Sequence, residues 1–297
     1  MKTVFSICLL VIGRMICSAQ DSTFYQNFEW SPDGKKIIAS ARIKSPDGKY
    51  YKEAFECYII DVNTHSLERK IANSEEPSWS ADGKYIAYSK IGKHSSDISL
   101  MDFTTGDSSI VMNLRYSSKI GFSPDNKRIC FSGFKDDKNH IYVRKLDSAG
   151  VMKISNDAFD CYGPMWSPQG DNIVYYRTGQ NQKGKVCMVN INEGKEIILT
   201  DDEINYICPS WLPDGKTIIC AFSHPVSKTS DEWQLAFLDI KGFRKRVIAN
   251  TIDAIFGRVA FDGKKIAFIK GGWPKNNIYI ANLDGSNQRC LTCGLHR

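Results

Sequence analysis

"PMWSPQGDNIVYYR", residues 164–177, places a tight turn between two apolar runs. Five similar stretches occur elsewhere, and the glycine position of their turn falls at residues 34, 83, 126, 170, 215 and 263, with asparagine at 126. In such a turn proline fixes one backbone angle, the aspartate side chain caps the turn, and glycine accepts a positive φ. Each stretch therefore predicts a β-hairpin, repeated every 43 to 49 residues.

Each repeat also has a second half. Short β-branched and aromatic runs such as Tyr58–Val62 and Ile278–Asn282 predict a third strand, and runs such as Ile198–Thr200 predict a fourth. A period in the forties is typical of propeller blades of about four strands. The sequence therefore predicts an all-β fold, a six-bladed β-propeller of four-stranded antiparallel blades.

The tryptophan that opens four of the turns has two interpretations. Exposed tryptophans can stack on sugars, but a residue at the same place in four repeats, at the end of an inner strand, is better explained by packing between neighbouring blades. We therefore interpret Trp30, Trp79, Trp166 and Trp211 as structural. The repeated aspartate is likewise assigned to the turn itself.

Residues 1–20 have the layout of a secretory signal peptide, and residues 21–297 are assigned to the propeller. Lys2 gives a positive start, Val4–Gly13 is apolar, and Cys17–Ala19 supplies small residues before Gln20. The apolar run is too short to span a bilayer, so we expect no transmembrane segment. The expected location is the periplasm or the outside of the cell.

Charge and motifs exclude several classes of function. The net charge is +6, or +4 without Lys2 and Arg14, and the lysines stand singly, whereas a nucleic-acid binder shows a clustered basic stripe. The sequence contains no GxSxG nucleophile motif and no phosphate-binding loop. We expect a monomer without a cofactor and without catalytic residues.

The ten cysteines include two in the expected signal peptide. Cys130, Cys187 and Cys220 lie in apolar strand runs and are interpreted as small buried hydrophobic residues. A bridge between Cys161 and Cys208 stays open, as does one between the last two cysteines. Cys290 and Cys293 have CxxC spacing, but no βαβ pattern accompanies them, so a redox role is not favoured.

The WSPDG turns, with the IYxxD and LT segments that follow them, resemble TolB-like (PD40, WD40-like) propeller repeats over roughly residues 22–293. The resemblance implies a six-bladed propeller exported to the bacterial periplasm. TolB itself carries an N-terminal α/β domain before its propeller, and we expect this chain to lack one. Whether the protein takes part in a Tol–Pal-type system is therefore left open.

Function is expected on the divergent end of the ring, where the chain approaches each inner strand beside the central channel. These approaches combine aromatic and charged side chains, which suit a protein or peptide partner in the cell envelope, or a glycan. The alternative is that several tyrosines only cover the ends of the inner strands. The candidate binding residues are Tyr25, Glu76, Tyr116, Lys119, Asp160, Tyr162, Asn205, Tyr206, Phe256 and Arg258.

An enzyme on the same scaffold is the alternative class. Oligogalacturonate lyases have similar repeats and histidine-rich metal sites, and His94, His140 and His224 are placed by the sequence on equivalent loops of three blades. Their offsets from the turn glycine differ, however, so we expect no metal site. The sequence therefore favours a non-catalytic binding module and leaves the ligand unidentified.

Overall fold

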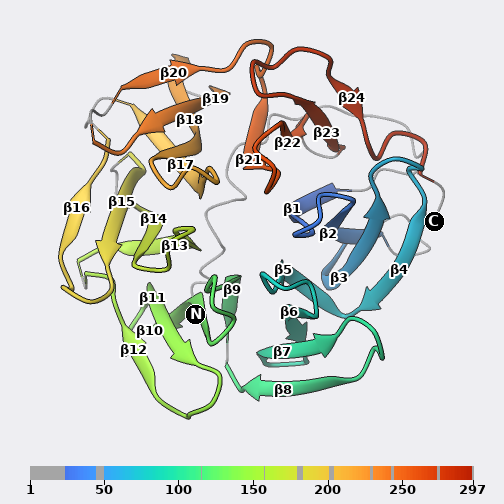
Figure 1. Ribbon diagram of the computed structural model, residues 1–297, viewed down its shortest axis with the longest axis vertical. Helices are drawn as coiled ribbons and strands as arrows, with labels where there is room; N and C mark the ends of the chain where they lie inside the picture. Colours follow the sequence, from blue (N-terminus) through green and yellow to red (C-terminus); the bar gives the residue numbers. More distant parts are fainter. Residues whose placement is uncertain are drawn as a thin grey trace.

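Six four-stranded sheets stand around a central axis in the residues that the computed structural model describes, which are 24–44, 50–114, 116–156, 158–178, 183–200, 204–227, 230–241, 244–272 and 275–295 (Figure 1). Every sheet is antiparallel and is made of four consecutive strands. The predicted six-bladed propeller is therefore confirmed. Across these ranges, no helix has the length and apolarity that a membrane crossing needs. The predicted signal peptide lies outside the described residues.

Within each blade the strands run from the axis outward in chain order. The first three blades are β1 (Phe24–Trp30), β2 (Lys36–Lys44), β3 (Tyr50–Asp61) and β4 (Leu67–Ala72); β5 (Ser74–Trp79), β6 (Tyr85–Ile91), β7 (Ser96–Asp102) and β8 (Ser108–Met112); and β9 (Ser117–Phe122), β10 (Arg128–Lys135), β11 (Lys138–Lys145) and β12 (Val151–Lys153).

Blades 4 to 6 repeat this order. They are β13 (Asp160–Trp166), β14 (Asn172–Thr178), β15 (Lys185–Asn190) and β16 (Glu196–Ile198); β17 (Asn205–Trp211), β18 (Thr217–Ser227), β19 (Ser230–Asp239) and β20 (Lys245–Val247); and β21 (Ala254–Val259), β22 (Lys265–Lys270), β23 (Asn277–Asn282) and β24 (Arg289–Cys290).

The repeated turns join the first and second strands of each blade, all at one end of the ring, which we call the turn end. Their glycine position has a positive φ in every blade, from 58° at Asn126 to 76° at Gly170. In blade 2 the Ser80 hydroxyl donates to the Asp82 carboxylate and accepts the N–H of Tyr85. The Ser80 hydrogen bond lowers the pKa of Asp82. The aspartate therefore belongs to the turn, as predicted.

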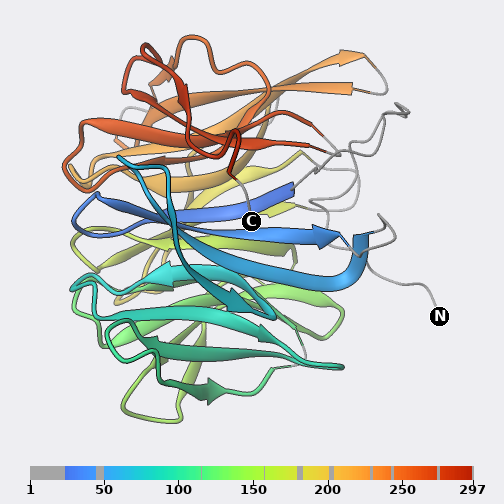
Figure 2. The same ribbon diagram turned by 90° about the vertical axis from the view of Figure 1, so that its right-hand side faces the viewer.

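The opposite end, the loop end, carries the turns between second and third strands and the approaches to the inner strands. Figure 2 shows the β2–β3 hairpin (blue) and the β18–β19 hairpin (orange) extending far toward this end.

The four repeated tryptophans are buried between blades, with 3–7% of their surface exposed. Trp30 packs in one hydrophobic cluster with residues of blades 1 and 6, and Trp211 in another with residues of blades 4 and 5. The indole N–H of Trp30 donates to the carbonyl of Arg258 at 3.2 Å, and that of Trp211 donates to the carbonyl of Met165 at 3.1 Å. The structural interpretation of these residues is therefore confirmed.

Blades 1 and 6 meet at a seam that closes the ring. The Asn276 side chain accepts the N–H of Tyr25 at 2.7 Å and donates to the Tyr25 carbonyl at 2.9 Å. On the outer side, Arg289 of β24 donates to the Val62 carbonyl at 2.9 Å. The seam is therefore held by side chains that bond to backbone.

The cysteine questions are settled by the structure. Cys290 and Cys293 form a disulfide, whereas Cys161 and Cys208 are both buried and are not disulfide-bonded to each other. Cys130, Cys187 and Cys220 have no exposed surface, which confirms their interpretation as buried hydrophobic residues.

Candidate functional site

The inner strands of all six blades share an irregularity in their pairing. The pairing with the second strand shifts register in all six inner strands. The residue three positions before the tryptophan position lies at or next to this register shift. It has a positive φ in five blades, at Glu76, Lys119, Gly163, Cys208 and Phe256. Bulges re-aim side chains, and a positive φ is uncommon for residues other than glycine, so these positions have a special geometry.

A buried polar group, which we call the axial cluster, joins residues of four blades. It consists of Asn27, Glu29, Glu76, Lys119 and Arg258. The Lys119 ammonium lies 3.0 Å from the Glu29 carboxylate, although the two residues come from blades 3 and 1. Asn27 donates to the Glu76 carboxylate at 2.7 Å. Asn27, Lys119 and Arg258 are 1%, 5% and 4% exposed, so these contacts are shielded from bulk water.

Burial sets the electrostatics of this cluster. It raises the pKa of Glu76, while the Lys119 charge and the hydrogen bond from Asn27 act in the opposite direction. Burial likewise lowers the pKa of Arg258, which the carboxylates of Glu29 and Glu76 counteract. Arginine nevertheless stays charged in proteins. The axis therefore holds cations and carboxylates that stabilise one another away from solvent.

The guanidinium group of Arg258 does not use all of its hydrogen-bond donors within the described part of the chain. One terminal nitrogen donates to the carbonyl of its neighbour Gly257 at 3.0 Å, whereas Nε is buried without a hydrogen-bond partner in the described part of the chain. A buried donor without a partner is unfavourable and rare in native proteins. The guanidinium group is therefore equipped to donate to a carboxylate or carbonyl oxygen of a ligand.

The predicted aromatic residues divide into buried and accessible ones. Tyr25 and Tyr206 are 1% and 3% exposed and belong to the hydrophobic core, as the alternative interpretation proposed. Phe256 is half-buried against the core of blades 1 and 6. Tyr162 stacks on Tyr176 with ring centres 5.5 Å apart. Tyr116 is 59% exposed and is therefore the most accessible aromatic candidate.

Two predicted polar residues connect neighbouring blades. Asp160 of β13 accepts the N–H of Asn139, which lies on β11 of the preceding blade, at 2.9 Å. Asn205 of β17 accepts the N–H of Gly184, just before β15, at 2.7 Å. Both side chains are therefore engaged in contacts that fix one blade against the next.

Of the ten candidates, Glu76, Lys119 and Arg258 are brought together at the axis, and the aromatic residues are not. Asn27 and Glu29 complete the cluster, and the sequence reasoning did not select them. A signal was present, because Asn27 occupies the same repeat position as Glu76 and Lys119, and Glu29 occupies that of Arg258. Aligning the repeats on the tryptophan would have identified both residues.

The histidine placement requires a correction. His140 lies in β11 and is 4% exposed, and His224 lies in β18, whereas the sequence placed both on loops. The reason is that the β10–β11 and β18–β19 hairpins extend further than the apolar runs indicated. In the ranges given above, no three His, Cys, Asp or Glu side chains are grouped as a metal site.

Glu75, the neighbour of Glu76, allows the effect of burial on the pKa of these carboxyl groups to be tested. Burial and the Glu76 charge raise its pKa to about 8. A folded-state pKa above the unfolded value means that the folded protein holds a proton that the unfolded chain releases, so stability falls as the pH rises from about 4.5 to 8. We expect Glu75→Gln to remove the part of this fall that comes from Glu75, with a gain of a few kcal/mol at pH 8.

The measurement is the free energy of unfolding by urea at several pH values. Glu193→Gln, at an exposed position, is the matched control and should retain the wild-type pH dependence. A Glu75→Gln variant that loses stability between pH 5 and pH 8 as the wild type does would contradict the raised pKa.

Comparisons with known proteins agree with this architecture. The family model described as "TolB beta propeller domain" (PD40) matches residues 45–251. The Tol-Pal system protein TolB of Francisella tularensis subsp. mediasiatica is 27% identical over 260 residues, which cover 84% of this chain and 58% of that protein. The chain thus spans little more than half the length of this relative.

Solved structures show the same fold. TolB from Acinetobacter baumannii superposes with a TM-score of 0.70 at 19% identity, covering 86% of this chain and 63% of that one. An oligogalacturonate lyase in complex with manganese superposes with a TM-score of 0.63 at 13% identity, covering 90% and 77%. At these identities the likeness concerns the fold alone.

Proposed function

The chain belongs to the TolB β-propeller domain family, and from that premise we propose that it is a non-catalytic binding module of the cell envelope. Its partner is a protein or peptide segment that binds at the loop end of the ring. The proposal includes export by the signal peptide of residues 1–20 and action as a monomer. The name of the Francisella relative, a Tol-Pal system protein, supports a role among envelope proteins.

The observation that carries the proposal is the axial cluster. Four blades contribute a side chain to it, and two of its members, Glu76 and Lys119, hold a left-handed backbone conformation. Backbone strain of this kind is concentrated at functional sites. The unpartnered Nε of Arg258 supports a partner that presents a carboxylate or carbonyl oxygen.

The rim of the loop end supplies the contact surface in this proposal. Tyr116 is largely exposed and lies edge to face with Phe134, with ring centres 6.3 Å apart. Tyr162 presents a partly accessible ring whose hydroxyl accepts a hydrogen bond from Asn139 at 3.1 Å. Tyrosines that are held in place by neighbours bind partners at a low cost in side-chain entropy, and they are frequent at hot spots.

The test compares the two ends of the ring. A partner is first recovered from native envelope extract and purified, and its affinity is measured by titration. We expect Tyr116→Ala and Tyr162→Ala each to weaken binding by about 2 kcal/mol or more, the loss typical of hot-spot residues. Lys84→Ala and Lys216→Ala, beside the turns of the opposite end, should leave the affinity nearly unchanged.

Thermal unfolding of each variant separates loss of binding from loss of folding. Tyr206→Ala is a useful additional variant, because this buried residue should lower stability whatever the binding face is. If the lysine variants lose binding and the tyrosine variants retain it, the partner binds at the turn end and the proposed face is wrong.

A further inference from the structure

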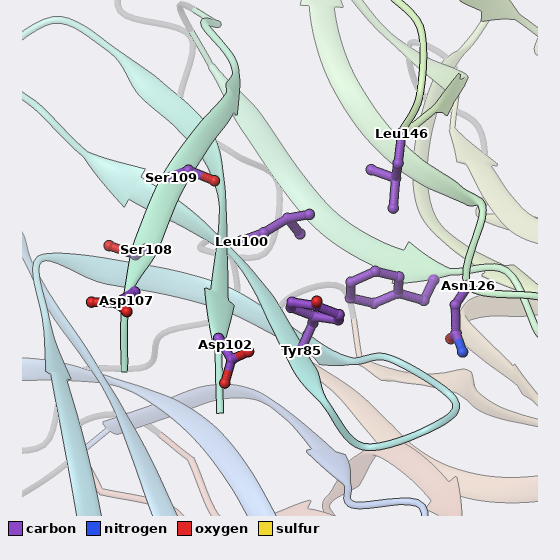
Figure 3. Close-up of a pocket in the computed structure, with 9 residues that line it drawn as sticks. Tyr85, Leu100, Asp102, Asp107, Ser108, Ser109, Asn126 and Leu146 are labelled. Atoms are coloured by element: carbon purple, nitrogen blue, oxygen red, sulfur yellow. The ribbon is translucent and has the colours of Figure 1, made fainter. Parts of the chain in front are cut away.

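A groove opens at the turn end between blades 2 and 3, away from the face assigned above. Its volume is about 480 Å³, and it is lined by Tyr85, Leu100, Asp102, Asp107, Ser108, Ser109, Phe122, Asn126 and Leu146. Figure 3 shows the blade 2 side chains Tyr85, Leu100 and Ser109 on one side of this space and Leu146 of blade 3 on the other. Volumes of this order accommodate small ligands or single side chains of a partner.

The corresponding place is occupied by an arginine at two other blade junctions. At the junction of blades 1 and 2, Arg69 of β4 donates to the carbonyl of Phe103 at 2.8 Å and lies 5.2 Å from the centre of its ring. At the junction of blades 6 and 1, Arg289 of β24 donates to the carbonyl of Val62 at 2.9 Å. The chain itself therefore places a guanidinium group between blades.

Strand register shows that blade 2 lacks this arginine. Arg69 pairs with Ile59, and Arg289 pairs with Ile280. Both isoleucines lie two residues before the end of the third strand of their blade, which is an Asp in blade 1 and an Asn in blade 6. In blade 2 the residue at that place is Leu100, two before Asp102, and its partner is Ser109. Ser109 therefore stands where blades 1 and 6 have arginine.

The acceptor at the junction of blades 2 and 3 corresponds to those used at the other junctions. Val62, Phe103 and Leu146 each donate their N–H to the carbonyl of the residue after the turn glycine position, which is Lys35, Lys84 and Lys127 respectively. The Leu146 carbonyl thus matches the two carbonyls that accept from Arg69 and Arg289. The side chain at the tryptophan position is also smaller in blade 3, where Phe122 stands in place of a tryptophan.

The charge of the groove suits a cation. Asp102 and Asp107 line it, and neither forms an ion pair with the described residues. One Asp102 oxygen accepts the N–H groups of Thr104 and Thr105, which holds the carboxylate in place. Tyr85, which is 41% exposed, and Phe122 offer aromatic surface for the aliphatic stem and the planar head of an arginine.

We propose that the groove between blades 2 and 3 binds the arginine side chain of a partner polypeptide. The guanidinium group donates to the Leu146 carbonyl and pairs with Asp102, while its stem packs on Leu100 and Tyr85. The partner thereby supplies the group that Arg69 and Arg289 supply within the chain. This site is independent of the loop-end function.

The probe is the α-N-acetyl amide of arginine, followed by shifts of backbone amide signals in NMR spectra of the whole protein. We expect a saturable shift of the signals of Ser109, Asp102 and Leu146, with a Kd on the order of millimolar, because a single side chain has few contacts. The neutral citrulline amide should bind at least about tenfold more weakly, since it lacks the charge.

Two variants of β8 make the test specific. Ser109→Arg should fill the groove from within, abolish the probe shifts and raise the unfolding temperature by a few degrees. Ile110→Arg adds the same side chain to the neighbouring, exposed position of β8, so it should leave probe binding in place. Normal probe binding by Ser109→Arg would overturn the proposal.

Further probes show which cationic group binds and whether it belongs to a polypeptide or to a free amino acid. Equal binding of the citrulline or lysine amide would overturn recognition of a guanidinium group. Tighter binding of free L-arginine than of its amide would assign the groove to a free amino acid and overturn a polypeptide partner. Probe shifts confined to other blades would overturn the location.

Discussion

Trp211→Ala is expected to lower the free energy of unfolding by about 3–5 kcal/mol, as is usual for a buried aromatic residue. Its ring is 7% exposed and packs between blades 4 and 5 in a cluster with Val174, Val186 and Ile218. The substitution leaves a cavity there and also leaves the carbonyl of Met165 without the indole donor. Urea unfolding followed by circular dichroism measures the change.

A pair of milder substitutions separates packing from hydrogen bonding. Trp211→Phe keeps an aromatic ring and loses the donor, whereas Trp166→Phe loses an indole N–H that has no partner among the described residues. We expect the Trp211 variant to lose about 1 kcal/mol more than the Trp166 variant. Phe261→Ala, at a residue that is 52% exposed, serves as the control and should change stability by less than about 0.5 kcal/mol. Equal losses at the two tryptophans would show that the bond to Met165 contributes nothing.

Asn276→Ala is expected to destabilise the protein by about 2–4 kcal/mol. Asn276 is 2% exposed, and its side chain satisfies both the N–H and the carbonyl of Tyr25, which is also buried. Truncation removes both hydrogen bonds to these buried backbone groups, at about 1–2 kcal/mol for each. The free energy of unfolding by urea, measured for the variant and the wild type, checks this value.

Asn192→Ala is the matched control, because Asn192 is exposed and lies within blade 4. It should leave stability within about 0.5 kcal/mol of the wild type. If Asn276→Ala behaves like this control, the seam between blades 1 and 6 does not depend on the paired hydrogen bonds of Asn276.

The fold was predictable because its signal is local and repeated. A turn such as Ser80–Gly83 specifies its own geometry through residues that are adjacent in sequence, and six copies fix the number of blades. Burial of the repeated tryptophans could be inferred for the same reason. A single hairpin, such as that of residues 164–177, predicts only two paired strands, and its five further copies predict the six-bladed ring.

The candidate site was predictable only in part. Glu76, Lys119 and Arg258 were selected as charged residues, but their meeting at the axis depends on bulges, and nothing in residues such as Glu76 or Lys119 indicates a left-handed backbone. Tyr25 and Tyr206 both lie five residues before the tryptophan, where the chain turns side chains into the core. That inward direction follows from the three-dimensional course of the strand and not from the residue type.

The seam has a consequence for the order in which the molecule forms. Each blade pairs strands that are neighbours in sequence, whereas the bond between Asn276 and Tyr25 joins residues 251 positions apart. Contacts between distant residues are entropically expensive until the intervening chain is ordered. We therefore expect the blades to form before the contacts between blades 1 and 6 close the ring. Interactions absent from the transition state act on the unfolding rate, so we expect loss of the Asn276 bonds to speed unfolding more than it slows folding.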